Sequence, residues 1–340
     1  MDLIVFSGKR YAADFRKHLL RAAQADGCRA THVQCGRGVL VVTQGENVVA
    51  EYRGVRSYLQ AFRLLRPLFH GDRTIVLYGT GPGLSLFALF ISVITVASCC
   101  SCYDVYDDFT YDATGATRCL RWMVDRYWRW VCQRVVILDP NLAGRYPGAL
   151  HLDNASHLSP QRKPPTSTGS EALRLVYAGT IDDRTDFEFL YALAAKDVTL
   201  DIYGRVHPDY PGAGLRLGRL LAARANVRFL GEYDNDELEE ILPQYQIGVV
   251  PYLPSHRLTT HINPDKIYHY LNVGLEVVSL PIPQTVRLAD YIHIVDGSQS
   301  LETVLRSSIL SPRSSGWIAR RYTWDARWSQ LRGTMQAGDE

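Results

Sequence analysis

The sequence has almost no net charge. Its 340 residues carry 37 Lys or Arg and 35 Asp or Glu, a formal charge of +2. This balance disfavours a general nucleic-acid binder, which needs a clear excess of cations. The hydrophobic share of 46% and the charged share of 21% exclude a disordered, collagen-like or coiled-coil chain.

Cysteine is scarce as well, and the patterns that would make it structural are missing. The seven cysteines are an odd number, which suits free thiols in a reducing cytosol better than a disulfide framework. No pair of C-x-x-C motifs offers metal-ligand spacing. The apolar run Leu3–Phe6 is too short for a secretory leader. We therefore expect a cytoplasmic protein that binds no metal.

One long uncharged run does occur, from Leu84 to Tyr103. Its twenty residues are enough to cross a bilayer, so membrane insertion is one interpretation. Its first part has helical spacing, and its second part is rich in β-branched and thiol side chains. That pattern favours a buried helix over 84–94 followed by a central strand over 96–105.

Short apolar runs alternate with amphipathic ones along the whole chain. The predicted strands are 3–6, 39–43, 74–78, 96–105, 135–139, 173–177, 198–203, 227–230, 247–251 and 277–280. The predicted helices are 14–25, 57–69, 84–94, 117–132, 186–195, 215–223, 236–242 and 264–273. Alternating strands and helices predict parallel sheets covered on both faces.

The length corresponds to about two domains, and the fold class is α/β with two Rossmann-like, doubly wound domains facing a central cleft. We predict an N-terminal acceptor-side domain over 1–154, a Pro- and Ser-rich linker over 155–172, and a nucleotide-binding domain over 173–312. A closing helix and tail over 313–340 would return to the N-terminal domain. Residues 1–150 have a net charge of 18 − 12 = +6 and the remainder 19 − 23 = −4, so the first half could face an anionic surface.

Glycines follow several strands of the second half. Doubly wound sheets bind ligands at the carboxyl ends of their strands. In the second half these ends contain Gly179, Tyr203, Gly204, Gly231 and Tyr252. Such a rim suits a nucleotide or a diphosphate, although each glycine alone is also an ordinary turn residue and no G-x-G-x-x-G or Walker sequence stands there.

The helix predicted after His261 and Ile262 carries an unusual charge. Asn263 would cap it, Pro264 would be its first residue, and Gly274 would end it. Lys266 then lies in the first turn, where a cation opposes the helix dipole unless an anionic ligand meets it. His269 follows on the same face. The alternative is an exposed lysine beside a structural histidine.

Four stretches of the second half resemble bacterial polysaccharide sugar transferases with the GT-B fold. They are YAGTIDDRTDFEFL (177–190), IYGRVHPD (202–209), NVRFLGEYDNDELEEILPQYQIGVVPY (226–252) and INPDKIYHYLNVGLEVVSLPIPQ (262–284). YDVYDDF (103–109) and YTWDARWSQL (322–331) resemble the acidic strand end and the closing helix of that group.

The resemblance implies a nucleoside diphosphate sugar, such as a UDP-sugar, bound by the second domain, and a glycan acceptor held by the first. The loop after Gly231, with Tyr233, would frame the base. Gly179 and Arg184 would line the diphosphate, and Lys266 would neutralise a phosphate. Fixed cations can replace a metal ion there, and no cofactor is implied.

The sequence departs from the group at two positions. Retaining members carry two glutamates eight positions apart, where this chain has His261 and His269. A histidine can still bond a ribose hydroxyl or a phosphate, but the substitution favours an inverting reaction. An inverting transfer needs a base, for which Asp104, Asp107, Asp108 and Asp112 are candidates. We select Asp107, with Asp108 beside it, although such clusters also serve as helix caps.

Two stretches interleave arginine with aromatic residues, at 53–69 and 118–134. They suit the anionic inner face of the cell membrane, or else a helix that packs its tryptophans on the sheet and leaves its arginines in water. The prediction is thus a cytoplasmic, peripheral sugar transferase of cell-surface polysaccharide synthesis, whose glycan acceptor is lipid-linked on a polyprenyl carrier. The rivals are a nucleotide-sugar epimerase of the same fold and a non-catalytic sugar-nucleotide-binding protein.

Overall fold

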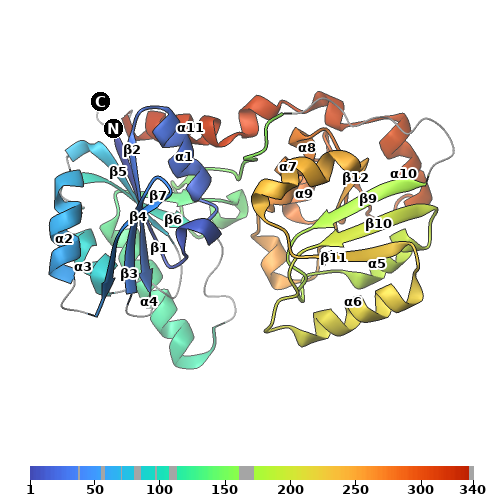
Figure 1. The fold of residues 1–340 in the computed structure, drawn as a ribbon, viewed down its shortest axis with the longest axis horizontal. Helices are drawn as coiled ribbons and strands as arrows, with labels where there is room; N and C mark the ends of the chain where they lie inside the picture. The colour runs from blue at the N-terminus through green and yellow to red at the C-terminus, as the bar shows by residue number, and fades with distance from the viewer. Residues whose placement is uncertain are drawn as a thin grey trace. The chain divides into compact units, whose positions relative to one another are not determined.

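The chain forms two compact units, described here from a computed structural model that covers residues 1–36, 39–54, 58–69, 71–79, 86–95, 98–106, 113–160 and 172–336. The first unit combines residues 1–153 with the segment from Trp324 onward, and the second contains residues 154–323. Each unit is built on its own sheet (Figure 1). The prediction of an α/β chain with two doubly wound sheets is confirmed.

The first sheet has eight strands in the order β4-β3-β2-β1-β5-β6-β7-β8. They are β1 (Asp2–Ser7), β2 (Arg29–Gly36), β3 (Val39–Gln44), β4 (Asn47–Arg53), β5 (Gly71–Gly79), β6 (Cys99–Val105), β7 (Arg134–Ile137) and β8 (Leu150–His151). Strands β3 and β4 run antiparallel to their neighbours. The sequence predicts neither β2 nor β4, and β4 is an edge strand whose side chains are mostly exposed, so its apolar signal is short.

The helices of the first unit are α1 (Lys17–Ala25), α2 (Tyr58–Leu65), α3 (Leu86–Thr95), α4 (Gly115–Val131) and the closing helix α11 (Trp324–Gln336). Helix α1 begins at Lys17 instead of Asp14, because the Asp14 carboxylate accepts the backbone N–H of Arg16 at 3.0 Å. Helix α11 packs against α1, where the indole of Trp328 donates to Asp26 at 2.8 Å.

The uncharged run from Leu84 divides as the prediction requires. Helix α3 ends at Thr95 and strand β6 begins at Cys99, so the order of helix and strand is confirmed. The helix is only partly buried, because Phe90 and Val93 are exposed. A span across a bilayer needs a longer apolar helix, and the described part of the chain contains none.

Helix α4 buries one of its three tryptophans. The Trp128 ring stacks on Tyr78 of β5 at 4.5 Å and lies 6.4 Å from Tyr103 of β6, ring centre to ring centre. Trp122 and Trp130 point away from the core, with 52% and 82% of their surface exposed. The helix therefore covers the sheet with one side and presents aromatic surface on another.

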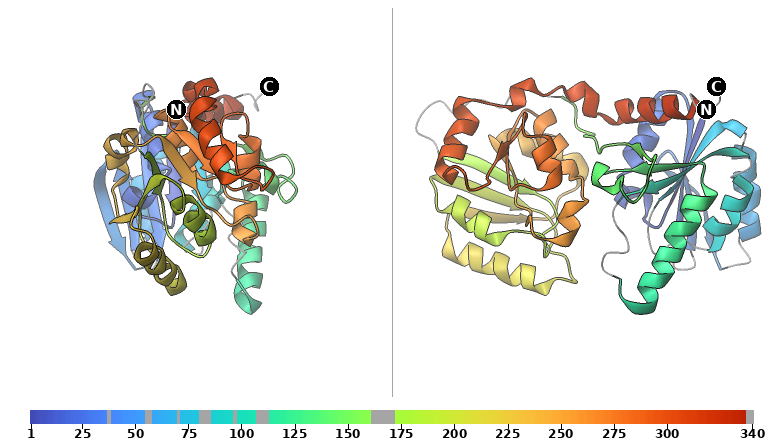
Figure 2. Two further views of the ribbon diagram at one scale, coloured as in Figure 1. Left: turned by 90° about the vertical axis from the view of Figure 1, so that its right-hand side faces the viewer. Right: turned by 180° about the vertical axis from the view of Figure 1, so that it is seen from behind.

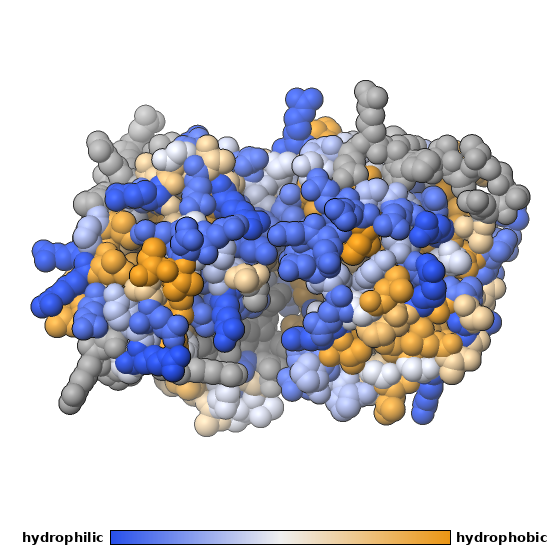
Figure 3. Space-filling model, in the orientation of Figure 1, coloured by the Kyte–Doolittle hydropathy of each residue, from blue (hydrophilic) through white to orange (hydrophobic). Residues whose placement is uncertain are grey.

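The second sheet has six parallel strands in the order β11-β10-β9-β12-β13-β14. They are β9 (Leu173–Ala178), β10 (Val198–Tyr203), β11 (Val227–Gly231), β12 (Ile247–Val250), β13 (Glu276–Ser279) and β14 (His293–Ile294). The helices are α5 (Phe187–Ala194), α6 (Pro211–Ala223), α7 (Leu238–Ile241), α8 (Asp265–Asn272), α9 (Pro283–Arg287) and α10 (Leu301–Leu310). Figure 3 shows an apolar patch over β11 and α6, where Leu215, Phe229 and Leu230 are exposed.

The start of the predicted linker is packed into the second unit. Ala155, Ser156 and Leu158 are buried, and Ser156 pairs with Thr323 in an isolated bridge. The Ser156 hydroxyl also lies 3.0 Å from Nδ1 of His269. Residues 161–171 lie outside the described part of the chain.

Candidate functional site

The second sheet reverses its direction of winding at β9. Strand β10 pairs with one side of β9 and β12 with the other. The connections leaving these two strands therefore diverge, which opens space at their carboxyl ends for a ligand. The residues that follow β9 and β12 are Gly179 and, one residue on, Tyr252.

Three glycines bring neighbouring strand ends together at this edge. The N–H of Gly179 donates to the carbonyl of Tyr203 at 3.0 Å, and the N–H of Gly204 donates to the carbonyl of Gly231 at 2.7 Å. A Cβ on Gly204 would stand 1.9 Å from the carbonyl oxygen of Gly179, and its φ is +138°. Only glycine fits there, and both amides bond the strand ends to one another.

Helix α8 places Lys266 in its first turn, as predicted, but its start is one residue later than expected. Pro264 is the N-cap and Asp265 the first helical residue. Asn263 is not the cap, because its Oδ1 accepts the Tyr268 hydroxyl at 2.9 Å and its carbonyl accepts Nδ2 of Asn154 at 2.6 Å. Gly274 ends the helix with a φ of +82°.

The Lys266 side chain is buried at the ends of β9 and β12. It is 6% exposed, and Nζ donates to the Tyr252 hydroxyl at 2.6 Å. Nζ also lies 4.6 Å from the ring centre of Tyr252 and 5.4 Å from that of Tyr177. A Cβ on Gly179 would fall 2.6 Å from Nζ, so the glycine makes room for the ammonium.

The Lys266 ammonium has no carboxylate within salt-bridge distance among the described residues. A buried cation is costly unless it is paired. Its contacts are instead a phenol oxygen and two aromatic faces, which attract a cation less strongly than an anion does. The position is therefore suited to an anionic ligand.

Arg184 approaches the same phenol from another element. Its guanidinium lies 5.5 Å from the ring centre of Tyr252 and its Nε donates to Asp182 at 2.9 Å. Burial opposes the charge, but Tyr252 and Asp182 outweigh it and raise the pKa of Arg184 above its ordinary value. The Tyr252 side chain therefore contacts both Lys266 and Arg184.

His269 is buried one turn after Lys266. Its Nδ1 lies 3.0 Å from the Ser156 hydroxyl, its Nε2 lies 3.9 Å from Asp265, and its ring is edge-on to His157 at 4.6 Å. Burial is the main cause that lowers the pKa of His269 to about 4. The ring is therefore neutral at pH 7 and can offer both a donor and an acceptor.

Lys266 and His269 share a small cavity with one residue of the predicted base-binding loop, Tyr233. The other lining residues are Ala178, Asn235, Leu238, Leu242, Asp265 and Tyr270. Tyr203 does not line the cavity but packs edge-on against Tyr233, with the two ring centres 6.3 Å apart.

Comparison with protein-family models and with curated proteins finds no match. Solved structures do match over the full chain. A sucrose-phosphate synthase from Thermosynechococcus elongatus is 14% identical with a TM-score of 0.67, and the alignment covers 99% of this chain and 98% of that one. The protein has the GT-B fold. Anabaena Alr3699/HepE, solved with UDP and glucose, is 13% identical with a TM-score of 0.62, covering 99% of this chain and 100% of that one.

Within the GT-B fold the predicted residues divide into groups. Lys266, His269 and Tyr233 line one cavity, and Gly179 and Arg184 join it through contacts with Lys266 and Tyr252. His261 lies outside that lining. It is half-buried after the short helical segment Arg257–Thr260, and its Nδ1 has no hydrogen-bond partner among the described residues.

Tyr252 belongs to the site but is absent from the residues predicted to bind the donor. The sequence signal was its position directly after the predicted strand 247–251. That signal identifies a strand end and does not reveal that Lys266 and Arg184 meet there.

The predicted base lies in a segment that is not described. Asp107 and Asp108 fall within residues 107–112, outside the described part of the chain. Asp104, an earlier candidate, is fully buried and bonded by Arg16 at 2.6 and 2.7 Å. It is therefore engaged in a structural ion pair.

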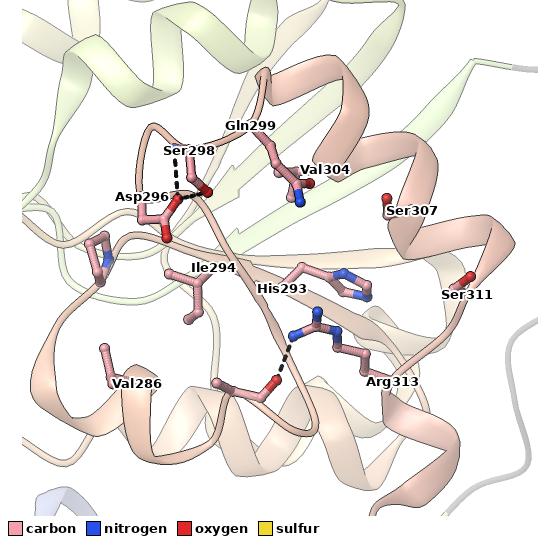
Figure 4. Close-up of a pocket in the computed structure, with 12 residues that line it drawn as sticks. Val286, His293, Ile294, Asp296, Ser298, Gln299, Val304, Ser307, Ser311 and Arg313 are labelled. Carbon is pink, nitrogen blue, oxygen red and sulfur yellow. Dashed lines mark hydrogen bonds between the residues drawn. The ribbon is translucent and has the colours of Figure 1, made fainter.

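A larger cavity of this protein lies elsewhere in the second unit, along β14 between α9 and α10 (Figure 4). Its charged and imidazole side chains are bonded within the protein. Asp296 accepts from Ser298, Arg313 donates to the carbonyls of Ala289 and Ile292, and His293 bonds the buried Glu276. None of the predicted donor-binding residues lines it.

The depressed pKa of His269 makes stability depend on pH. The unfolded state binds a proton near pH 6.5 and the folded state only near pH 4, so stability is full above pH 6.5 and falls as the pH drops towards 4. The unfolding free energy of the wild type should therefore fall between pH 7 and pH 4.5, and in His269→Gln this fall should be smaller by up to about 3 kcal/mol. Urea unfolding at pH 4.5 and pH 7 measures it, and an unchanged pH slope in the variant would contradict the assignment.

Proposed function

We propose that the protein is a glycosyltransferase that takes a sugar from a nucleoside diphosphate donor, UDP-linked in the first instance, and transfers it to a glycan acceptor. The observation that carries this proposal is the buried Lys266 ammonium at the ends of β9 and β12, which has no carboxylate partner among the described residues. A diphosphate would supply the missing charge. The GT-B fold and the UDP held by Anabaena Alr3699/HepE support the choice of ligand.

Lys266 and Arg184 also offer a chemical role. Cations placed beside a leaving diphosphate stabilise the negative charge that develops as the glycosidic bond breaks, so they act on rate as well as on binding. Two fixed cations make a divalent ion unnecessary. We therefore propose that transfer continues in EDTA.

Thermal unfolding with purified nucleotide sugars tests the donor site, because a bound ligand raises the midpoint by mass action. Product analysis with a labelled donor then tests the reaction. Transfer of label to lipid-extracted material supports a lipid-linked acceptor of cell-surface polysaccharide synthesis. Isomerised donor alone would replace the proposal with an epimerase, and nucleotide binding without release from any acceptor would replace it with a sugar-nucleotide-binding protein.

We further propose inversion at the sugar carbon, with Asp107 as the base that removes the proton of the acceptor hydroxyl. Asp107→Asn should leave UDP affinity unchanged and lower turnover by about 10²- to 10⁴-fold. Asp108→Asn tests the second predicted carboxylate in the same assay. Full turnover of the Asp107 variant, or product of retained configuration, would contradict this assignment.

The place of the reaction follows from its acceptor. A polyprenyl-linked glycan stays at the membrane, while nucleotide sugars are soluble. We propose that the protein works in the cytoplasm at the inner face of the cell membrane.

A further inference from the structure

Helices α2, α3 and α4 form one layer over the first sheet. The Phe62 and Phe90 rings join α2 to α3 at 5.9 Å, and the hydroxyls of Ser92 and Tyr127 join α3 to α4 at 2.7 Å. In Figures 1 and 2 the N-terminal end of α4 extends beyond the strands that it covers. Residues 114–120 are accordingly all exposed.

The outer surface of this layer is unusually apolar. Of the seventeen large apolar side chains exposed in the described part of the chain, eight lie on these three helices. They are Leu59, Leu64, Phe90, Val93, Leu120, Trp122, Met123 and Trp130. Clusters of this kind mark a surface that is covered by a partner.

The charge of the same surface has a single sign. The three helices carry the arginines Arg63, Arg118, Arg121, Arg126 and Arg129. Their one carboxylate, Asp125, is buried and accepts the hydroxyls of Tyr103 at 2.9 Å and Tyr146 at 2.7 Å. The exposed charge is therefore wholly positive.

Apolar and cationic groups alternate closely on α4. The Arg126 guanidinium lies 5.6 Å from the Trp122 ring centre, and Trp130 follows one turn later. Tryptophan favours the boundary between headgroups and acyl chains, and arginine binds the phosphates of that boundary.

We infer that the outer face of α2, α3 and α4 docks on an anionic lipid bilayer. Positive charge complements the anionic headgroups, and the exposed tryptophan, leucine and phenylalanine side chains enter the interface between them. This inference rests on the proposed function, because docking would hold the acceptor-side unit at the membrane where a lipid-linked acceptor lies.

Co-sedimentation with vesicles of phosphatidylcholine, with and without about 30% phosphatidylglycerol, tests the docking surface. The full chain should bind only the anionic vesicles, and salt near 0.5 M should release it, because the Debye length falls to about 4 Å. Arg118→Glu/Arg126→Glu should weaken binding by about tenfold or more, and Trp130→Ala by a few-fold. The matched control is Arg216→Glu/Arg219→Glu on α6, two exposed arginines of the other unit, which should bind as the wild type does.

Several results would overturn the inference. They are equal binding to neutral vesicles, binding to neither, unchanged binding of the α4 variants, or an equal loss in the α6 control. Binding of a single-stranded oligonucleotide that the α4 substitutions abolish, without vesicle binding, would assign the face to nucleic acid.

The same variants separate docking from sugar transfer. Their thermal midpoints should match the wild type, because the replaced side chains are exposed, and UDP should still shift those midpoints. For the wild-type protein, vesicle binding without any UDP shift would refute the proposed function and leave the docking face intact, whereas a UDP shift without vesicle binding would refute docking and leave the proposed function intact.

Discussion

Lys266→Met is expected to weaken UDP binding by at least about tenfold and to lower kcat/KM for sugar transfer by about 10³-fold. The wild-type ammonium is buried against Tyr252 and has no carboxylate partner among the described residues, so its charge is available to a diphosphate. Methionine keeps most of the apolar length of the side chain and removes the charge together with the hydrogen bond to Tyr252. Isothermal titration with UDP and transfer of a labelled sugar measure the two losses.

The fold should survive this substitution. Removing a buried cation that lacks a carboxylate partner relieves a desolvation cost, so the thermal midpoint without ligand should stay level or rise. Lys196→Met is the matched control, since Lys196 lies in the same unit, is 37% exposed and is 4.0 Å from Glu302. If Lys266→Met bound UDP as tightly as the wild type, the donor site would have to be sought elsewhere.

Arg16→Met is expected to destabilise the first unit by about 3–5 kcal/mol. Arg16 and Asp104 are both fully buried, and two hydrogen bonds of 2.6 and 2.7 Å join them. Burial opposes the charge of Arg16, but Asp104 overcomes it and raises the pKa of Arg16. Without the guanidinium, the Asp104 carboxylate would be left unpaired in the interior.

The guanidinium of Arg16 also packs among aromatic rings. It lies 4.8 Å from the ring centre of Phe15 and 5.8 Å from that of Trp324 at the start of α11. The substitution should therefore loosen the closing helix as well, and urea unfolding followed by tryptophan fluorescence detects both effects.

The double variant Arg16→Met/Asp104→Leu provides the comparison. It removes both charges, so most of the lost stability should return. The prediction would be contradicted if the single variant lost less than about 1 kcal/mol of unfolding free energy. It would also be contradicted if the double variant were no more stable than the single one.

Much of the fold was predictable because its signals are local. Buried parallel strands appear as short apolar runs and helices as amphipathic ones, and β9, β10 and β12 lie where those runs predict them. Strand β4 could not be predicted in the same way, although its hairpin partner β3 was. A strand exposed on its outer edge, such as β4, buries few side chains and so leaves a weak pattern.

The sequence likewise predicted the local part of the candidate site but not its long-range contacts. A proline and a glycine bracket α8, so the first-turn position of Lys266 follows from the sequence, with an error of one residue in the cap. The contact between Arg184 and Tyr252 does not follow from it, and neither does the closure of the Gly179, Gly204 and Gly231 strand ends. Each depends on which strands become neighbours.

The sequence by itself determined most of the elements, the α/β class and the helix that carries Lys266, because hydrophobic period and helix capping act over a few residues. Only the tertiary structure decided that Asp104 pairs with Arg16, 88 positions away, and that Lys266 and Arg184 meet at Tyr252. It also decided that two of the three tryptophans of α4 face outward. These contacts join segments that are far apart in the sequence, so they depend on how the chain packs. Burying a charge or an aromatic ring is favourable only when a complementary partner is buried beside it.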